Sequence, residues 1–244
     1  MRILVVNPNT TAGMTATIGA AARSVAAPGT EIEALNPAMG PASIEGYYDE
    51  AFALPGLLQE IGAAEQRGCQ GAVIACFDDT GLDAARSLAT MPVVGICEAA
   101  MHLASLIAHK FAVVTTLSRS IPPLEMLSRR YGVGERCAVR ASDIPVLALE
   151  HPTEAIMKRL LDECRRAIDQ DHAEAIILGC AGMTALAAKL AQELNMPVID
   201  GVVASVKLVE ALVGLGLKTS KRGGYATPLP KTYTGLLAPF APKG

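Results

Sequence analysis

Two segments of the chain resemble each other, and each opens with an apolar run that ends in cysteine. The first reads AVIACFDDTGLDAARSLATMPVVGICEAAMHLA from position 72, and the second reads AIILGCAGMTALAAKLAQELNMPVIDGVVASVKLV from position 175. Each predicts a strand, a loop, a helix, a Met-Pro turn and a second strand. Cys76 precedes Pro92 by 16 residues, and Cys180 precedes Pro197 by 17. Such a duplication predicts two pseudo-twofold lobes whose two thiols face each other across one cleft.

Short apolar runs rich in Val and Ile alternate with longer helical patterns along all 244 residues. Because these runs are apolar throughout, they are typical of parallel strands that are buried on both faces. We expect strands at Ile3–Val6, Glu31–Leu35, Ala72–Ala75, Val93–Ile96, Phe111–Thr115, Glu135–Arg140, Ala175–Leu178 and Pro197–Ile199. We expect helices near Thr11–Ala26, Ala51–Arg67, Gly81–Ala89, Ala99–Ala108, Ile121–Arg130, Pro152–Gln170, Ala185–Leu194 and Ala204–Val213. The repeated β-α order predicts an α/β fold of two similar lobes, each a roughly four-stranded parallel sheet flanked by helices.

The duplication also divides the chain into lobes. The start, MRILVVNPNT, has a counterpart in HKFAVVTTLSR from position 109, so each half carries about four strands. We place the first lobe at residues 1–98 together with about 214–244, and the second lobe at residues 99–213. The active site is expected in the cleft between them. The Pro- and Gly-rich C-terminal stretch from about residue 217 is predicted to pack across the first lobe.

Composition excludes several classes of protein. Hydrophobic residues make up 51% of the chain, which is enough for a sizeable core, and the net charge of −3 leaves no basic footprint for nucleic acid or a membrane surface. The apolar run at the N-terminus is too short for a secretory signal, and no uncharged stretch reaches the roughly 18–20 residues of a membrane helix. Six cysteines without such a signal predict a cytoplasmic protein with free thiols. No Cys/His spacing suggests a metal site.

Polar residues follow four of the expected strands at their carboxyl ends, where open parallel sheets bind their ligands. These residues are Asn7, Asn9 and Thr10 after the first strand, Cys76–Thr80 after the third, Thr115 and Thr116 after the fifth, and Gly179–Met183 after the seventh. Four loops are therefore predicted to converge on one cleft.

Two thiols on opposite walls can move a proton across a carbon atom. Backbone N–H groups and a helix N-terminus close to each cysteine are expected to lower the thiol pKa from about 8.5. One thiolate then removes a proton next to a carbonyl, and the other thiol returns a proton from the opposite side. The hydroxyls of Thr80, Thr115 and Thr116, with nearby backbone N–H groups, are expected to bind the enolate oxygen. This scheme requires no cofactor.

Packing is the alternative interpretation of each candidate. A lone cysteine at a strand end is more often a core residue, and we assign four cysteines to packing: Cys69, Cys97, Cys137 and Cys164. Asp78 and Asp79 are interpreted as residues that orient a substrate amide or assist proton movement, while Asp79 equally suits an N-cap of the following helix. Asn9 and Thr10 have the same alternative at the first helix.

Four motifs resemble the aspartate/glutamate racemase superfamily, and within it most closely the hydantoin racemases. They are NPNT after the first strand, SIEG at Ser43–Gly46, ACFDDTGLDAAR around Cys76 and LGCAGM around Cys180. The resemblance extends over nearly the whole chain. It implies a two-lobed α/β fold with the active site between the lobes, cofactor-independent racemisation by two cysteines, and a homo-oligomer.

The resemblance also implies roles for individual residues. Cys76 and Cys180 are the expected acid/base pair. The residues expected to line the substrate are Asn9, Phe77, Asp78, Asp79, Thr80, Thr115, Thr116, Gly179, Ala181, Gly182 and Met183. Phe77, Ala181 and Met183 make the site less polar, which favours a neutral ring with an apolar 5-substituent.

The sequence thus predicts an isomerase that racemises 5-substituted hydantoins, with a small-molecule substrate and neither nucleic acid nor membrane as partner. The alternatives are an allantoin racemase, a maleate-type isomerase in which one thiolate adds to an alkene, and another amino-acid racemase of the superfamily. A two-lobed ligand-binding protein without catalytic activity is the alternative outside enzymes.

Overall fold

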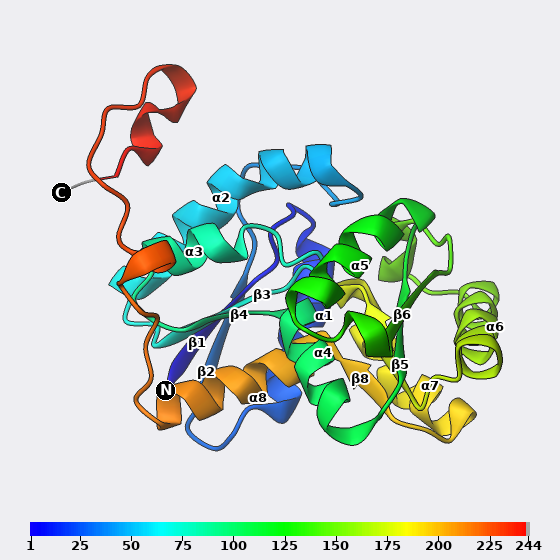
Figure 1. Ribbon diagram of the computed structural model, residues 1–244. Helices are drawn as coiled ribbons and strands as arrows, with labels where there is room; N and C mark the ends of the chain where they lie inside the picture. Colours follow the sequence, from blue (N-terminus) through cyan, green and yellow to red (C-terminus); the bar gives the residue numbers. More distant parts are fainter. Residues whose placement is uncertain (243–244) are drawn as a thin grey trace.

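The computed structural model describes residues 1–242 and has two α/β lobes side by side (Figure 1). The first half of the chain forms β1 (Arg2–Val6), α1 (Ala12–Val25), β2 (Glu31–Leu35), α2 (Tyr47–Gln66), β3 (Gly71–Ile74), α3 (Leu82–Leu88), β4 (Val93–Gly95) and α4 (Ile96–Ile107). The second half forms β5 (Phe111–Thr115), α5 (Ile121–Arg130), β6 (Cys137–Ala141), α6 (Glu154–Asp171), β7 (Ala175–Gly179), α7 (Ala187–Leu194), β8 (Val198–Asp200) and α8 (Gly201–Gly214). Within residues 1–242 no helix is both long and apolar enough to span a membrane.

The two sheets have the same strand order, which confirms the predicted fold class. The first sheet runs β2-β1-β3-β4 and the second β6-β5-β7-β8, with every pairing parallel. Val6 pairs with Ile74, and Thr115 pairs with Gly179. The loops that follow these central strands therefore leave each sheet at neighbouring points, on the carboxyl-end edge.

Alternate residues of each strand enter different cores, because successive side chains point to opposite faces of a sheet. In β1, Ile3 and Val5 join a central core between the two sheets, whereas Leu4 and Val6 face α2 and α3. The central core also receives side chains of α1, α4, α5 and α8. The outer face of the second sheet packs against α6 and α7. Each large aliphatic side chain buried in this way contributes about 1.5–3 kcal/mol.

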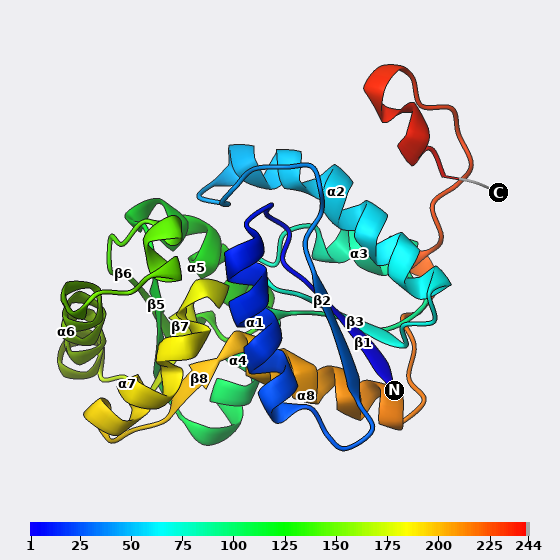
Figure 2. The same ribbon diagram turned by 180° about the vertical axis from the view of Figure 1, so that it is seen from behind.

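Helices α4 and α8 join the lobes. Both helices contact strands of the first sheet and strands of the second, and they contact each other (Figures 1 and 2). The lobe boundaries at residues 98–99 and about 213–214 therefore fall within or beside elements that belong to both sheets, and they stay a prediction.

Several element boundaries differ from expectation. Helices α4 and α8 each begin three residues earlier than expected, at Ile96 and Gly201, so Ile96 belongs to α4 and not to the strand before it. Two other differences have clear local reasons. Helix α2 begins at Tyr47 rather than near residue 51, since Asp49 accepts a hydrogen bond from the backbone N–H of Glu45 and fixes the first turn. Strand β6 begins at Cys137 rather than at residue 135. Arg136 donates to the carbonyl groups of Ser105, Ala108 and His109, and this holds its backbone in a 3-10 turn outside the strand.

The C-terminal tail returns to the first lobe and then leaves it. The Thr219 N–H donates to the Thr90 carbonyl at 3.0 Å, and Lys221 donates to the Arg86 and Ser87 carbonyls at the end of α3. Beyond Tyr225 the chain stands away from both lobes (Figures 1 and 2). The predicted packing of the tail on the first lobe is thus observed as far as Tyr225 and is wrong for residues 226–242. Residues 243–244 of the predicted tail lie outside the described residues.

Candidate active site

The loops at the carboxyl ends of the strands enclose one cavity, and Cys76 and Cys180 both line it. This inner cavity has a volume of about 30 Å³. Its other lining residues are Asn7, Asn9, Met14, Ile44, Ala75, Phe77, Asp78, Thr115, Thr116, Ser120, Val146, Gly179 and Ala181. Cys76 follows β3 of the first sheet, and Cys180 follows β7 of the second. The wall of the inner cavity therefore carries one thiol from each sheet.

The Cys76 sulfur has two donors close by. The Thr80 hydroxyl lies 3.4 Å from Sγ, and the Asp78 backbone N–H also donates to the sulfur. Burial nevertheless raises the pKa of the Cys76 thiol well above its usual range, and the Asp78 carboxylate adds to this rise. The neutral thiol is therefore the favoured form of Cys76 at neutral pH.

Cys180 precedes a 3-10 helix, Ala181–Leu186, and its sulfur accepts a hydrogen bond from the Gly182 N–H. Burial raises the pKa of Cys180 to about 12 despite this donor. The expectation of lowered pKa values is therefore wrong for both cysteines. Burial is the largest cause of both rises and outweighs the few donors.

Asp78 lies where the inner cavity meets a second, larger pocket. This outer pocket has a volume of about 380 Å³ and is lined by Tyr47, Glu50, Asp78, Asp79, Thr80, Gly81, Leu82, Asp83, Ala84, Pro123, Met126, Leu127, Arg130 and Tyr131. Burial and then the nearby Glu50 raise the pKa of Asp78 to about 7. Glu50 itself has a buried oxygen, Oε1, without a hydrogen-bond partner. The inner end of the outer pocket therefore carries two carboxyl groups.

Asp79 caps a helix other than the expected one. Its carboxylate accepts hydrogen bonds from the backbone N–H groups of Cys97, at 3.0 Å, and Glu98, at 2.9 Å, in the first turn of α4. The Tyr131 hydroxyl donates to the same carboxylate at 2.6 Å. Burial raises the pKa of Asp79 to about 7, and these three donors oppose the rise. Asp79 therefore connects the Cys76 loop with α4 instead of capping α3.

The structure brings most of the predicted site residues together. Those that line the inner cavity are Cys76, Cys180, Asn9, Phe77, Asp78, Thr115, Thr116, Gly179 and Ala181. Asp79 and Thr80 line the outer pocket instead. Gly182 and Met183 line neither pocket. The Gly182 backbone N–H donates to the Cys180 sulfur, and the Met183 side chain is fully buried in the core of the second lobe. The Thr115 hydroxyl donates to the Gly179 carbonyl at 3.0 Å, so it braces two strands rather than pointing a free donor at a substrate.

Several lining residues were not among the predicted substrate contacts. Asn7 was predicted to lie at the cleft, after the first strand, and it does line the inner cavity. It donates to Asn9 at 2.8 Å and to Thr15 at 3.0 Å, so it holds the first loop in shape. Ser120 follows the predicted Thr115–Thr116 loop and was accessible to the same reasoning. The remaining unpredicted residues are apolar and carry no chemical signal in the sequence: Met14, Ile44, Ala75 and Val146.

The other cysteines stay outside both pockets. Cys69, Cys97 and Cys164 are buried in three different cores, and Cys137 is half-buried. Among residues 1–242, no three His, Cys, Asp or Glu side chains lie together in an arrangement that could hold a metal ion.

Comparison with known proteins agrees with this architecture. The profile of the Asp/Glu/Hydantoin racemase family matches residues 3–209. A hydantoin racemase from Pseudomonas sp. (strain NS671) is 49% identical over 98% of this chain and 97% of its own, and one from Rhizobium meliloti is 49% identical over 96% and 98%. The solved allantoin racemase from Klebsiella pneumoniae is 50% identical, covers 100% of both chains and superposes with a TM-score of 0.96.

The two parallel sheets, with a cavity at the carboxyl ends of their strands, thus form the fold of a racemase. A racemase is an isomerase. The chain belongs to the Asp/Glu/Hydantoin racemase family. The resemblance inferred from the sequence motifs is confirmed.

Proposed function

We propose that the protein racemises 5-substituted hydantoins without a cofactor, with Cys76 and Cys180 acting on opposite faces of the C5 carbon. The observation that carries this proposal is the presence of one thiol from each lobe in the wall of a single cavity. The nearly full-length similarity to hydantoin racemases supports the substrate class.

The proposed reaction moves one proton off C5 and another onto it. One cysteine acts as thiolate and takes the C5 proton, and the electrons of the broken C–H bond form an enolate on the adjacent carbonyl. The second cysteine, as thiol, donates its proton to the opposite face of C5, so the sulfurs exchange protonation states. The Thr116 hydroxyl and backbone N–H groups of the cavity wall are the proposed donors to the enolate oxygen.

The outer pocket is the proposed place for the 5-substituent, since it adjoins the inner cavity at Asp78. Its far wall includes Pro123, Met126 and Leu127, which suit an apolar group. Its inner end carries the carboxyl groups of Glu50 and Asp78, which suit N–H donors.

Allantoin racemisation is the second candidate, and two observations favour it. The 5-substituent of allantoin is a ureido group, whose N–H donors match the carboxyl groups at the inner end of the outer pocket. The solved allantoin racemase is also as similar to this chain as the hydantoin racemases are. Loss of optical rotation, followed side by side for L-benzylhydantoin and (R)-allantoin, separates the two. A higher kcat/KM for the benzyl compound supports the first candidate, and a clear preference for allantoin replaces it with the second.

Single substitutions test the two cysteines. Cys76→Ser and Cys180→Ser are each expected to abolish racemisation, because each removes the acid/base group from one face. Cys137→Ser is the matched control, since that thiol is half-buried and lies outside both pockets. Racemisation that survives in either active-site variant at the rate of the control would refute the assignment.

We also propose a cytoplasmic homo-oligomer. Light scattering of the purified protein tests the assembly, and a mass equal to a single chain would count against it.

A further inference from the structure

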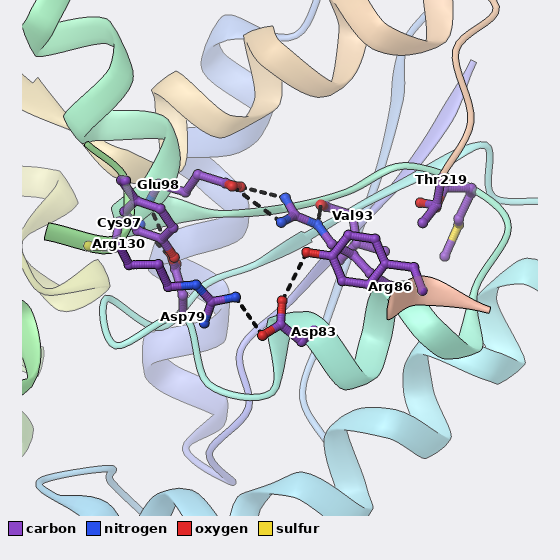
Figure 3. A network of polar contacts seen from close by, with 11 residues as sticks. Asp79, Asp83, Arg86, Val93, Cys97, Glu98, Arg130 and Thr219 are labelled. Atoms are coloured by element: carbon purple, nitrogen blue, oxygen red, sulfur yellow. Dashed lines mark hydrogen bonds and ion pairs between the residues drawn. The ribbon is translucent and has the colours of Figure 1, made fainter. Parts of the chain in front are cut away.

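Two neighbouring residues of the second lobe hold carboxylates of the first lobe. Arg130 ends α5, and its guanidinium forms an ion pair with Asp83 of α3 at 2.5 Å. Tyr131 follows directly, and its hydroxyl donates to Asp79 at 2.6 Å. Figure 3 shows Arg130 and Asp83 facing each other, with Asp79 close to α4. The end of α5 therefore bridges the two lobes at two adjacent points.

Both carboxylates are fixed on the first-lobe side as well. Asp79 accepts from the backbone N–H groups of Cys97 and Glu98. Asp83 accepts from the Tyr225 hydroxyl at 3.0 Å, so the C-terminal tail holds it in place. Each bridge thus joins α5 to a group whose position is already determined by other bonds.

One of these bridges leads directly to the Cys76 thiol. The Asp79 backbone N–H donates to the Cys76 carbonyl at 3.0 Å, and the next residue, Thr80, places its hydroxyl on the Cys76 sulfur. A displacement of Asp79 therefore displaces Cys76. Cys180, by contrast, follows β7, and α5 packs against β6 of the same sheet. The bonds of Arg130 and Tyr131 consequently connect the wall that carries one thiol to the wall that carries the other.

Stability alone does not explain the Arg130–Asp83 pair. Its side chains are 50% and 49% exposed, and ion pairs at such exposure add little to stability. The Tyr131 bond differs, since it reaches a carboxylate that is only 5% exposed. What the two bonds share is their position between the lobes, beside the Cys76 loop.

We propose that Arg130 and Tyr131 are positioning residues that set the relation of the Cys76 and Cys180 sulfurs across the inner cavity. This inference rests on the proposed two-thiol racemisation. Inversion at C5 needs both sulfurs aligned on one carbon, whereas exchange of the C5 proton with solvent needs only one sulfur. Loss of a bridge therefore reduces inversion more than it reduces exchange with retention of configuration.

The test uses single enantiomers of 5-methylhydantoin in D₂O, since a small substituent makes few contacts in the outer pocket. NMR follows deuterium entry at C5, and chiral chromatography follows inversion. The variants are Tyr131→Phe and Arg130→Gln. Their matched controls are Tyr48→Phe, at an exposed tyrosine, and Arg129→Gln, at the exposed neighbouring arginine of α5.

Tyr131→Phe is expected to lower the inversion rate on the order of 10- to 100-fold, the loss typical of a misplacement of about 1 Å. Arg130→Gln is expected to change the rates in the same direction. Exchange with retention should change far less in both, so the ratio of exchange to inversion rises, and both controls should keep the wild-type ratio. Asp83→Asn should reproduce Arg130→Gln, and the double variant should be no worse than either single variant.

A parallel fall of exchange and inversion, which a merely destabilised protein would show, overturns the positioning role. An unchanged ratio in Tyr131→Phe and Arg130→Gln overturns it too. These results are distinguishable from failure of the proposed function, because in that case the wild-type protein itself neither exchanges nor inverts the C5 proton of any hydantoin.

Discussion

Gly95 allows the Asp79 carboxylate to approach α4, and a methyl group there should displace it. A Cβ atom at position 95 would overlap Asp79 Oδ1 and Cγ and lie 2.7 Å from Oδ2. The carboxylate would have to swing away from the backbone N–H groups of Cys97 and Glu98. Gly95→Ala therefore adds one carbon atom that disrupts the hydrogen bonds between Asp79, in the Cys76 loop, and the first turn of α4.

The expected cost follows from the bonds lost. Each hydrogen bond to a charged acceptor contributes about 1.5–3 kcal/mol, and the helix N–H groups left behind regain water only in part. Water at the N-terminus of α4 compensates part of this loss, so the free energy of unfolding should fall by roughly 2–4 kcal/mol. That value agrees with the combined cost of losing an N-cap and overpacking a core. For a chain of this size the melting temperature should fall by about 4–16 °C.

Urea unfolding followed by circular dichroism measures this change, with Gly62→Ala as the matched control. Gly62 lies inside α2, and a Cβ atom there meets only Leu88 Cδ2 at an ordinary 3.6 Å. Alanine in a helix interior gains about 0.5–1 kcal/mol over glycine, so the control should be slightly stabilised. The reasoning is refuted if Gly95→Ala unfolds within 0.5 kcal/mol of wild type, a margin on the order of a neutral surface substitution.

Three further predictions concern charge and pH. Because the pKa values of both thiols are raised, kcat/KM is expected to rise toward alkaline pH as thiolate forms. Asp78→Asn should shift this rise to lower pH, because the Asp78 charge raises the pKa of Cys76; a shift to higher pH, or none, in the pH-rate profile contradicts this. Asp78 and Asp79 have pKa values raised to about 7 from an unfolded value near 3.8, so the folded state holds more protons between these values. Their contribution to the free energy of unfolding should be complete below about pH 4 and lost by about pH 7. Between these values the free energy of unfolding should fall by up to ~1.4 kcal/mol per pH unit for each carboxyl. Urea unfolding across this pH range measures the fall. Iodoacetamide should inactivate the protein faster as pH rises and more slowly when substrate is present. Mass spectrometry should show that the cysteine protected from alkylation by substrate is Cys76 or Cys180. Alkylation confined to other cysteines would contradict the site.

The duplicated pattern predicted the fold because it encodes the same structural unit twice. Each half carries buried strands in the same sequence order, and parallel βα units have few permitted arrangements. The common strand order then places the loops after β3 and β7 at equivalent edges, so the cavity with Cys76 and Cys180 followed from two cysteines at equivalent positions.

The sequence could not reveal what arises between the lobes. The raised pKa values of Cys76 and Cys180 depend on burial by loops far away in the chain, whereas the local pattern showed only the nearby donors. Arg130 and Tyr131 lie at a helix end and resemble ordinary surface residues until their first-lobe partners are known. The sequence suited Asp79 equally to a substrate contact and to a cap of the next helix, but its carboxylate accepts from the first turn of α4 instead.

Deuterium exchange in the two cysteine variants tests the two-face arrangement most directly. With both enantiomers of one hydantoin in D₂O, Cys76→Ser should exchange the C5 proton of one enantiomer only, and Cys180→Ser should exchange that of the other, with no inversion in either case. If both variants exchange the same enantiomer, or if either exchanges both, the sulfurs at 76 and 180 do not serve opposite faces of one carbon.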